Sequence, residues 1–333
     1  MNQNSKDQFD HDYEKIADSA IIKSDHEYLF FGAPRTIPQS ADQTALNCQS
    51  LLLPALAQDI YTALYCKLSP HGLANSNLIT QREHLAALSA ANCGRGSWEP
   101  GWQITSIQSD GKIGVARENV TFWVYETGLR CTSSNLAIGT FCRVWVAKEM
   151  RYLLPGYYYA IGDGDSAERD TTGPVLRLYW NLTKLGSIAY IRLITSTLNE
   201  LRIPFRTKVI SDPNGFRRAD SGVLYIERAY SSVIRDLIWN VYQELSAQMG
   251  TDAPMFTKQI APGLGFAEDP GNGESFGQSR CRIAVDGLWN CLVKQEESRQ
   301  GRVEMLKTEF RKHGIAPEKP YLNSSCAGIL VEF

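Results

Sequence analysis

A cluster of basic residues around an expected strand and turn has the composition of an anion site. The segment IPFRTKVISDPNGFRRADSGVLYI, residues 203–226, holds four cations and two acids. On a strand, Arg206 and Lys208 share one face because side chains alternate, and the DPNG turn can fold Arg217 and Arg218 back beside them. Planar guanidinium groups suit phosphate oxygens, so the spacing indicates a phosphate site. The alternative is a solvated basic edge, since Lys and Arg also protect strand edges.

A second candidate for an anion site is a glycine-rich stretch that ends on two arginines. In GLGFAEDPGNGESFGQSRCR, residues 263–282, no Walker lysine follows the glycines, so the stretch is not a P-loop. Glycines at this density serve positive φ or the close approach of a ligand, and long loops are usually functional or disordered. We expect Arg280 and Arg282 to contact a phosphate, with Glu274 orienting the arginines. The alternative is a plain surface loop.

These two segments, together with FTKQIAP before the second and PYLN at 320–323, resemble the HopPsyA-type family. The resemblance covers roughly residues 95–325. Its members are type III secretion effectors and many bacterial relatives. The effectors act inside a host cell, mostly as interaction proteins. Relatives beside peptide-maturation genes are similar to the lyase partner of a kinase-like protein in class V lanthipeptide and thioviridamide-like peptide maturation.

The resemblance to those relatives implies a phosphoserine/phosphothreonine lyase. The kinase-like partner phosphorylates serine or threonine in a precursor peptide, and the lyase eliminates phosphate to leave dehydroalanine or dehydrobutyrine. We therefore expect a metal-independent carbon–oxygen lyase without a cofactor. The alternative is a non-catalytic effector-type module that binds a phosphopeptide or a protein. A nucleotide-dependent enzyme would have to use GDGDSA at 162–167, where Asp163 and Asp165 would repel a pyrophosphate, so an acidic turn is favoured there.

Elimination needs a base for the Cα proton, donors for the peptide carbonyl and cations for the leaving phosphate. A lysine can be this base only where neighbouring cations or burial make its amine partly neutral. Lys208 is the first candidate and Lys258 the second. Tyr321 or Lys258 would protonate the leaving group; otherwise His84 or His313 would have to fold in. The expected phosphate ligands are Arg206, Arg217, Arg218, Arg280 and Arg282, and the expected orienting acids are Asp220, Asp269 and Glu274, although Asp220 has the alternative of only pairing with Arg218.

The bulk composition is that of a globular protein with a real core. The 333 residues are 43% hydrophobic and carry a net charge of −2, which gives no sign of general nucleic-acid or membrane-surface binding. No apolar run is long enough to span a bilayer, and the polar N-terminus does not resemble a Sec signal. The eight scattered cysteines without a CxxC pair indicate a reducing compartment, so we expect a bacterial cytoplasmic protein. The five histidines form no metal-binding motif.

The pattern of elements favours an α+β fold. We expect a mostly helical N-terminal region at 1–94, a candidate peptide-docking part, and a HopPsyA-like catalytic domain at 95–333. The latter opens with a central antiparallel β-meander, whose Asp-Gly hairpin is at 110–111, and continues as a mixed α/β C-terminal half. The aromatic residues between 98 and 180 read as sheet core and cross-strand pairs. Helices are expected at 47–68, 79–94, 183–203, 233–249, 278–295 and 301–313, strands at 205–211 and 221–228, and a loop at 262–277.

Overall fold

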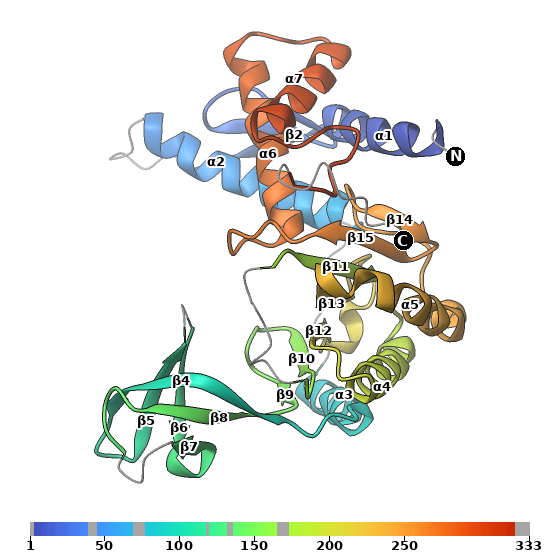
Figure 1. Cartoon of the computed structure of the whole chain (residues 1–333). Coiled ribbons are helices and arrows are strands. Elements are labelled where there is room, and N and C mark those ends of the chain that lie inside the picture. Colours follow the sequence, from blue (N-terminus) through green and yellow to red (C-terminus); the bar gives the residue numbers. More distant parts are fainter. Residues whose placement is uncertain are drawn as a thin grey trace.

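A seven-stranded antiparallel sheet forms the centre of the protein (Figure 1). The computed structural model describes residues 3–38, 45–68, 77–117, 120–131, 136–164 and 173–323. The strand order is β14-β15-β11-β13-β12-β10-β9, so the two strands nearest the C-terminus lie at one edge of the sheet and β9 and β10 at the other. The strands are β9 Glu149–Met150, β10 Tyr157–Ile161, β11 Val175–Trp180, β12 Phe205–Ile210, β13 Gly222–Glu227, β14 Lys258–Ala261 and β15 Leu264–Glu268.

One face of this sheet is apolar and covered by helices. Trp180 of β11 contacts Tyr190 of α4 (Lys184–Glu200), with ring centroids 5.3 Å apart. The Tyr190 hydroxyl lies 2.8 Å from the Thr207 hydroxyl of β12, which satisfies both buried groups. Helix α5 (Ser231–Leu245) packs beside α4, and α3 (Leu78–Ala91) lies on the other side of it. Because side chains alternate along a strand, the neighbouring residues of β11 and β12 point to the opposite face, which α4 and α5 do not cover.

The helices at the two ends of the chain pack on each other at one edge of the sheet. They are α1 Gln3–Ser19, α2 Ala45–Ile60, α6 Phe276–Val293 and α7 Arg299–Lys312, with a small sheet of β1 Ala20–Ile22, β2 Glu27–Phe30 and β3 Ala33–Thr36. Tyr13 contacts Phe310 at 5.2 Å and Phe256 at 5.4 Å between ring centroids. Buried side chains before residue 94 thus belong to the same core as those of the C-terminal half. The division at residue 94 stays a prediction.

A five-stranded antiparallel sheet extends from the body with a small core of its own (Figure 1). Its strands are β4 Ser97–Ile107, β5 Lys112–Arg117, β6 Val120–Tyr125, β7 Leu129–Cys131 and β8 Phe141–Val146. Gly111, at φ +82°, forms the predicted Asp-Gly hairpin between β4 and β5. Trp102 is buried and Trp98 pairs with Trp145 across strands, as expected, but Trp123 is 53% exposed on the outer face.

The α+β fold class is confirmed, with three differences in detail. The aromatic segments YYYAIG and VLRLYWNL contain β10 and β11, and both strands belong to the central sheet instead of the meander. The N-terminal region contains β1–β3 beside its helices. The expected loop at 262–277 is wrong in its first half, because Leu264–Glu268 is a strand with all five residues buried. A strand that is buried on both faces lacks the alternation of apolar and polar residues that marks a strand with one exposed face.

Two glycines in that segment are needed for packing. Gly263 turns the β14–β15 hairpin at φ +77°. Gly277, in the first turn of α6, lies against two stacked tyrosines, Tyr61 and Tyr65, of the π-helical turn η1 (Tyr61–Tyr65). A Cβ at residue 277 would lie 2.5 Å from the Tyr65 ring and 2.7 Å from the Tyr61 ring.

None of the helices in the described residues is long and apolar enough to cross a membrane.

We predict that Gly277→Ala lowers the free energy of unfolding by about 1–3 kcal/mol, because the added methyl group must displace one of two packed rings. Urea denaturation followed by circular dichroism measures this change. The matched control is Gly128→Ala, where the nearest atom to a new Cβ is 3.7 Å away and a change within about 0.5 kcal/mol is expected. Equal stability of the two variants would contradict the packing argument.

Candidate functional site

The face of the central sheet opposite α4 and α5 gathers cations and tyrosines from four adjacent strands. Arg206 lies opposite Tyr225 in the register of β12 and β13, and Tyr225 lies opposite Arg177 of β11. One row along, Lys208 lies opposite Tyr159 of β10. We call this surface the basic–tyrosine face; it consists of Tyr157, Tyr159, Arg177, Arg206, Lys208 and Tyr225.

Lys208 lies at the centre of this face. Its ammonium nitrogen is 4.5 Å from the ring centroid of Tyr157 and 6.0 Å from that of Tyr225, so aromatic faces surround the charge. In the part of the chain that the structure describes, the ammonium group forms no ion pair. Burial lowers the pKa of Lys208; Tyr159 and Asp220 act against this shift, and Arg177 and Arg218 add to it.

A buried arginine–carboxylate pair lies next to Lys208. Arg218 donates from Nε to Asp220 Oδ1 at 2.6 Å and from Nη2 to Oδ2 at 2.8 Å, a bidentate pair. Its Nη2 also donates to the Tyr61 hydroxyl at 3.2 Å. Burial on its own would raise the pKa of Asp220, but Arg218 outweighs it and holds that pKa below its usual range. The predicted contact between Arg218 and Asp220 is therefore present, and the carboxylate of Asp220 is ionised.

A second such pair lies on the other side of Tyr225. Arg177 donates from Nε to Asp269 Oδ2 at 2.7 Å and from Nη2 to the backbone carbonyl of Glu274 at 3.2 Å. Its guanidinium carbon lies 5.2 Å from the Tyr225 ring centroid. Sequence reasoning missed Arg177, although a single charge inside the apolar strand VLRLYW was a usable signal, because a buried charge requires a partner.

The predicted phosphate ligands Arg206 and Arg217 are exposed. Arg206 lines a cavity of about 230 Å³ together with Tyr225 and with Val120 of the five-stranded sheet. Its guanidinium group makes no ion pair with any residue that the structure describes. Arg217 is also exposed and lies in the turn before Arg218. Arg206 is thus positioned to meet an anion at the rim of the basic–tyrosine face.

Arg280 is placed elsewhere. It is only 2% exposed, and it donates to the backbone carbonyls of Pro320 at 2.8 Å and Leu322 at 3.0 Å. Its Nη2 also donates to the Asn323 side chain at 3.1 Å. Burial lowers its pKa to about 10, so it stays charged at neutral pH. The residue fixes the PYLN segment to α6, and its helical spacing with Phe276, Ile283 and Ala284 marked it as a core position.

The other predicted residues are divided between the opposite sheet face and the surface. Tyr321 packs between Phe9 and Phe266, with centroids 5.7 and 6.1 Å away. Phe266 shares the register row of Leu178 and Lys258, on the face opposite Arg177. The structure therefore brings neither Tyr321 nor Lys258 to Lys208.

Arg282 and Glu274 form an exposed pair at 3.1 Å, outside the basic–tyrosine face. Of the two histidines considered, His84 packs edge-on against Phe216, and burial lowers its pKa to about 4. His313 lies at the end of α7 beside Glu309. In the predicted GDGDSA turn, Asp163 accepts from the backbone N–H groups of Arg95 and Gly96, while residues 165–167 lie outside the described residues.

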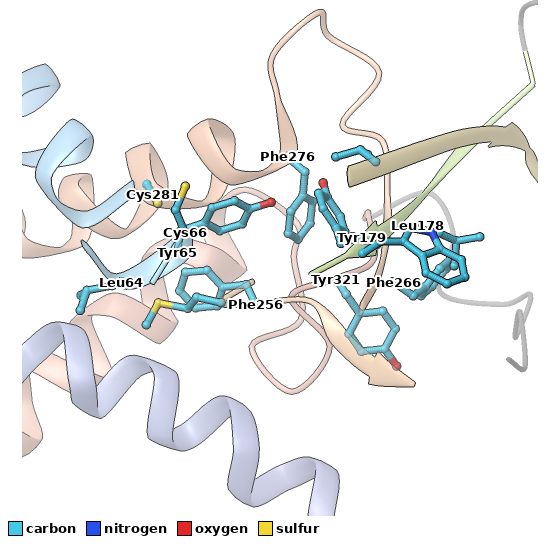
Figure 2. Close-up of a cluster of buried hydrophobic side chains, with 14 of the residues drawn as sticks. Leu64, Tyr65, Cys66, Leu178, Tyr179, Phe256, Phe266, Phe276, Cys281 and Tyr321 are labelled. Carbon is cyan, nitrogen blue, oxygen red and sulfur yellow. The ribbon is translucent and has the colours of Figure 1, made fainter. Parts of the chain in front are cut away.

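An aromatic cluster joins the sheet to the helical edge (Figure 2). Tyr65 lies 6.4 Å from both Tyr179 and Phe276 between ring centroids. Figure 2 shows Cys66 beside Tyr65, on the helical side of this cluster. Cys66 in turn lies 3.1 Å from Arg218, between its Sγ and the arginine Nη2. The apolar packing of η1 therefore determines where Arg218 lies relative to β11.

Comparison with known proteins agrees with this architecture. The model of the HopA1 effector protein family matches residues 149–322, a range that includes the basic–tyrosine face and both arginine–carboxylate pairs. The structure of the effector protein from Pseudomonas syringae pv. tomato strain DC3000 is similar over 97% of this chain and 99% of that one, with 16% identity and a TM-score of 0.50. The effector structure from P. syringae pv. syringae strain 61 has 14% identity over the same shares and a TM-score of 0.48.

At these identities the structural likeness concerns the fold alone. No curated protein is significantly similar to the chain. The family match covers just over half of the sequence and includes the motifs that carried the predicted resemblance. This protein belongs to the HopA1 effector protein family.

Proposed function

We propose that the protein is a phosphoserine/phosphothreonine lyase. It would eliminate phosphate from a precursor peptide that a kinase-like partner has phosphorylated, in the bacterial cytoplasm and without a metal or cofactor. The observation that carries the proposal is Lys208: a lysine buried against Tyr157 and Tyr225, without an ion pair in the described residues, and with its pKa lowered. Such a setting moves the pKa of a lysine toward the range in which a general base works, and perturbed pKa values gather at functional sites.

The chemistry is a β-elimination with Lys208 as the base. The neutral amine takes the Cα proton of the phosphorylated residue, and the electron pair of the Cα–H bond forms the Cα–Cβ double bond. The Cβ–O bond breaks, and its electrons leave with the phosphate. Serine gives dehydroalanine and threonine gives dehydrobutyrine. The Lys208 ammonium group then returns its proton to water.

The phosphate would lie against Arg177, Arg206 and Arg218. Arg177 and Arg218 each use one edge of the guanidinium group for a carboxylate, and a guanidinium has five N–H donors. Arg206 carries no carboxylate partner in the described residues. A phosphate dianion would raise the pKa of Lys208, so arginines close to the base are needed to oppose that effect. This assignment replaces Arg280, whose donors bind backbone carbonyls.

Protonated tyrosines supply further donors to the leaving phosphate. Burial raises the pKa of both Tyr225 and Tyr159, so their hydroxyl groups keep their protons at neutral pH. A phosphoryl dianion would otherwise leave as PO₄³⁻, so one of these hydroxyl groups protonates the leaving oxygen, hydrogen phosphate departs, and water returns a proton to the tyrosine. The face therefore provides hydrogen-bond donors for the role that Tyr321 was expected to fill.

A non-catalytic phosphopeptide-binding module is the second candidate. The exposed Arg206 at the rim and two arginines below it favour anion binding with or without turnover. The lyase is preferred because a lysine whose pKa is lowered by burial is suited to act as a general base.

Incubation with a phosphothreonine peptide should remove about 98 Da, the mass of phosphoric acid that elimination releases. Mass spectrometry of the peptide reads this directly. A loss of about 80 Da would identify a phosphatase instead. Saturable binding with an unchanged peptide mass would support the binding module.

We predict that Lys208→Met lowers the rate of elimination at least about a thousand-fold, because no other group on the face replaces the base. The free energy of unfolding should stay within about 0.5 kcal/mol or increase, because a buried charge without a partner has been removed. Lys208→Arg should also be inactive, since guanidinium stays protonated. Lys258→Met is the matched control and should retain activity. Substantial turnover by Lys208→Met would show that Lys208 is not the base.

The rate should rise with pH through the pKa of Lys208. Because the base acts when neutral and its pKa is lowered, kcat/KM should increase with pH and level off below the ordinary lysine value of about 10.4. Asp220 raises the pKa of Lys208, so Asp220→Asn should move the rise of kcat/KM to lower pH. A rise that stays at the same pH, or moves to higher pH, would contradict the proposed coupling between Asp220 and Lys208.

A further inference from the structure

A groove lies between α2 and α6, beside the basic–tyrosine face. It has a volume of about 680 Å³, within the range of roughly 300–1,000 Å³ typical of ligand pockets. Leu53, Pro54 and Ala57 of α2 and Val285 of α6 make up its apolar part. Its polar lining residues are Gln58, Tyr61, Glu274, Gln278, Arg282 and Asp286.

Two residues belong to the groove and contact the site arginines as well. The hydroxyl group of Tyr61 accepts a hydrogen bond from Arg218 at 3.2 Å. The backbone carbonyl of Glu274 accepts one from Arg177 at 3.2 Å, while its side chain pairs with Arg282. The groove therefore lies next to the arginines that would bind the phosphate.

The lining positions also give the groove a direction. On α2 and the first residue of η1 they recur at 53, 54, 57, 58 and 61, the spacing of a single helical face. The eight steps from Leu53 to Tyr61 advance about 12 Å at 1.5 Å per step. An extended peptide advances about 3.3 Å per residue, so three or four residues fit along this length.

We propose that this groove binds the peptide segment next to the phosphorylated residue, held in an extended conformation with apolar side chains on the α2–α6 floor. The inference rests on the proposed function, because it takes the phosphate site as one end of the bound peptide. Arg282 pairs with both Glu274 and Asp286 at the rim, and the apolar floor beside them offers burial to side chains of a peptide. Substrates with apolar residues beside the phosphorylated residue should therefore be preferred.

The test compares peptides of different length. Acetyl-phosphothreonine methylamide is the minimal probe, and two longer probes carry Leu-Ala-Leu-Ala either before or after the phosphothreonine. In the wild-type protein, one longer probe should have a KM at least about ten-fold lower than the minimal probe, as expected for burying one leucine side chain. Equal KM values for all three probes would overturn the inference.

Ala57→Trp fills the groove and should remove the advantage of the longer probe, while kcat/KM for the minimal probe stays unchanged. Gln58→Trp is a second variant at an exposed lining position, in case the first does not fold. The control is Val293→Trp, at a 62% exposed position of α6 outside the groove. If the longer probe keeps its lower KM in both Ala57→Trp and Gln58→Trp, the inference is overturned.

Two further outcomes separate the groove from the chemistry. If no probe loses phosphoric acid, the proposed function fails, and the groove is then tested by fluorescence polarisation with dye-labelled, unphosphorylated Leu-Ala-Leu-Ala-Thr and Thr-Leu-Ala-Leu-Ala. Binding that Ala57→Trp removes and Val293→Trp leaves would keep the groove as a peptide site, and no binding would overturn it. Loss of a dimer in sedimentation of Ala57→Trp would show a contact between copies, which also overturns it.

Discussion

The site depends on one electrostatic constraint, a lysine buried among tyrosines between two arginines that are each neutralised by a carboxylate. Arg218–Asp220 and Arg177–Asp269 lie on either side of Lys208 and Tyr225. Desolvation of the lysine favours its neutral form. The two ion pairs allow cations to stay near that lysine, because a buried guanidinium without a partner would be strongly destabilising.

The rest of the fold holds these groups at a fixed spacing. Antiparallel pairing of β12, β13 and β11 puts Arg206, Tyr225 and Arg177 in one row, so the positions follow from backbone register. The helices α4 and α5 cover the other face and leave this one open. The stacked tyrosines of η1, packed against Gly277, bring Tyr61 to Arg218. A change in that packing would move a site residue without touching the sheet.

Local features of the site could be predicted from the sequence, and its long-range contacts could not. Period-two spacing and the DPNG turn were enough to put Arg206 and Lys208 on one face and Arg218 beside Asp220. The pairing of Arg177 with Asp269 joins residues 92 positions apart, so no local pattern could show it. Arg280 was misplaced because its charge suggested an exposed ligand, whereas its helical face is apolar and its partners are carbonyls of a distant segment.

The protonation state of Lys208 is the quantity on which the account depends most directly. Carbon-13 NMR of lysine labelled at Cε, with Lys208→Met used to assign the signal, follows the titration of this one amine in the free protein. The account predicts a midpoint clearly below the ordinary lysine value of about 10.4. A midpoint at or above that value would leave Lys208 protonated at working pH and would contradict its role as the base.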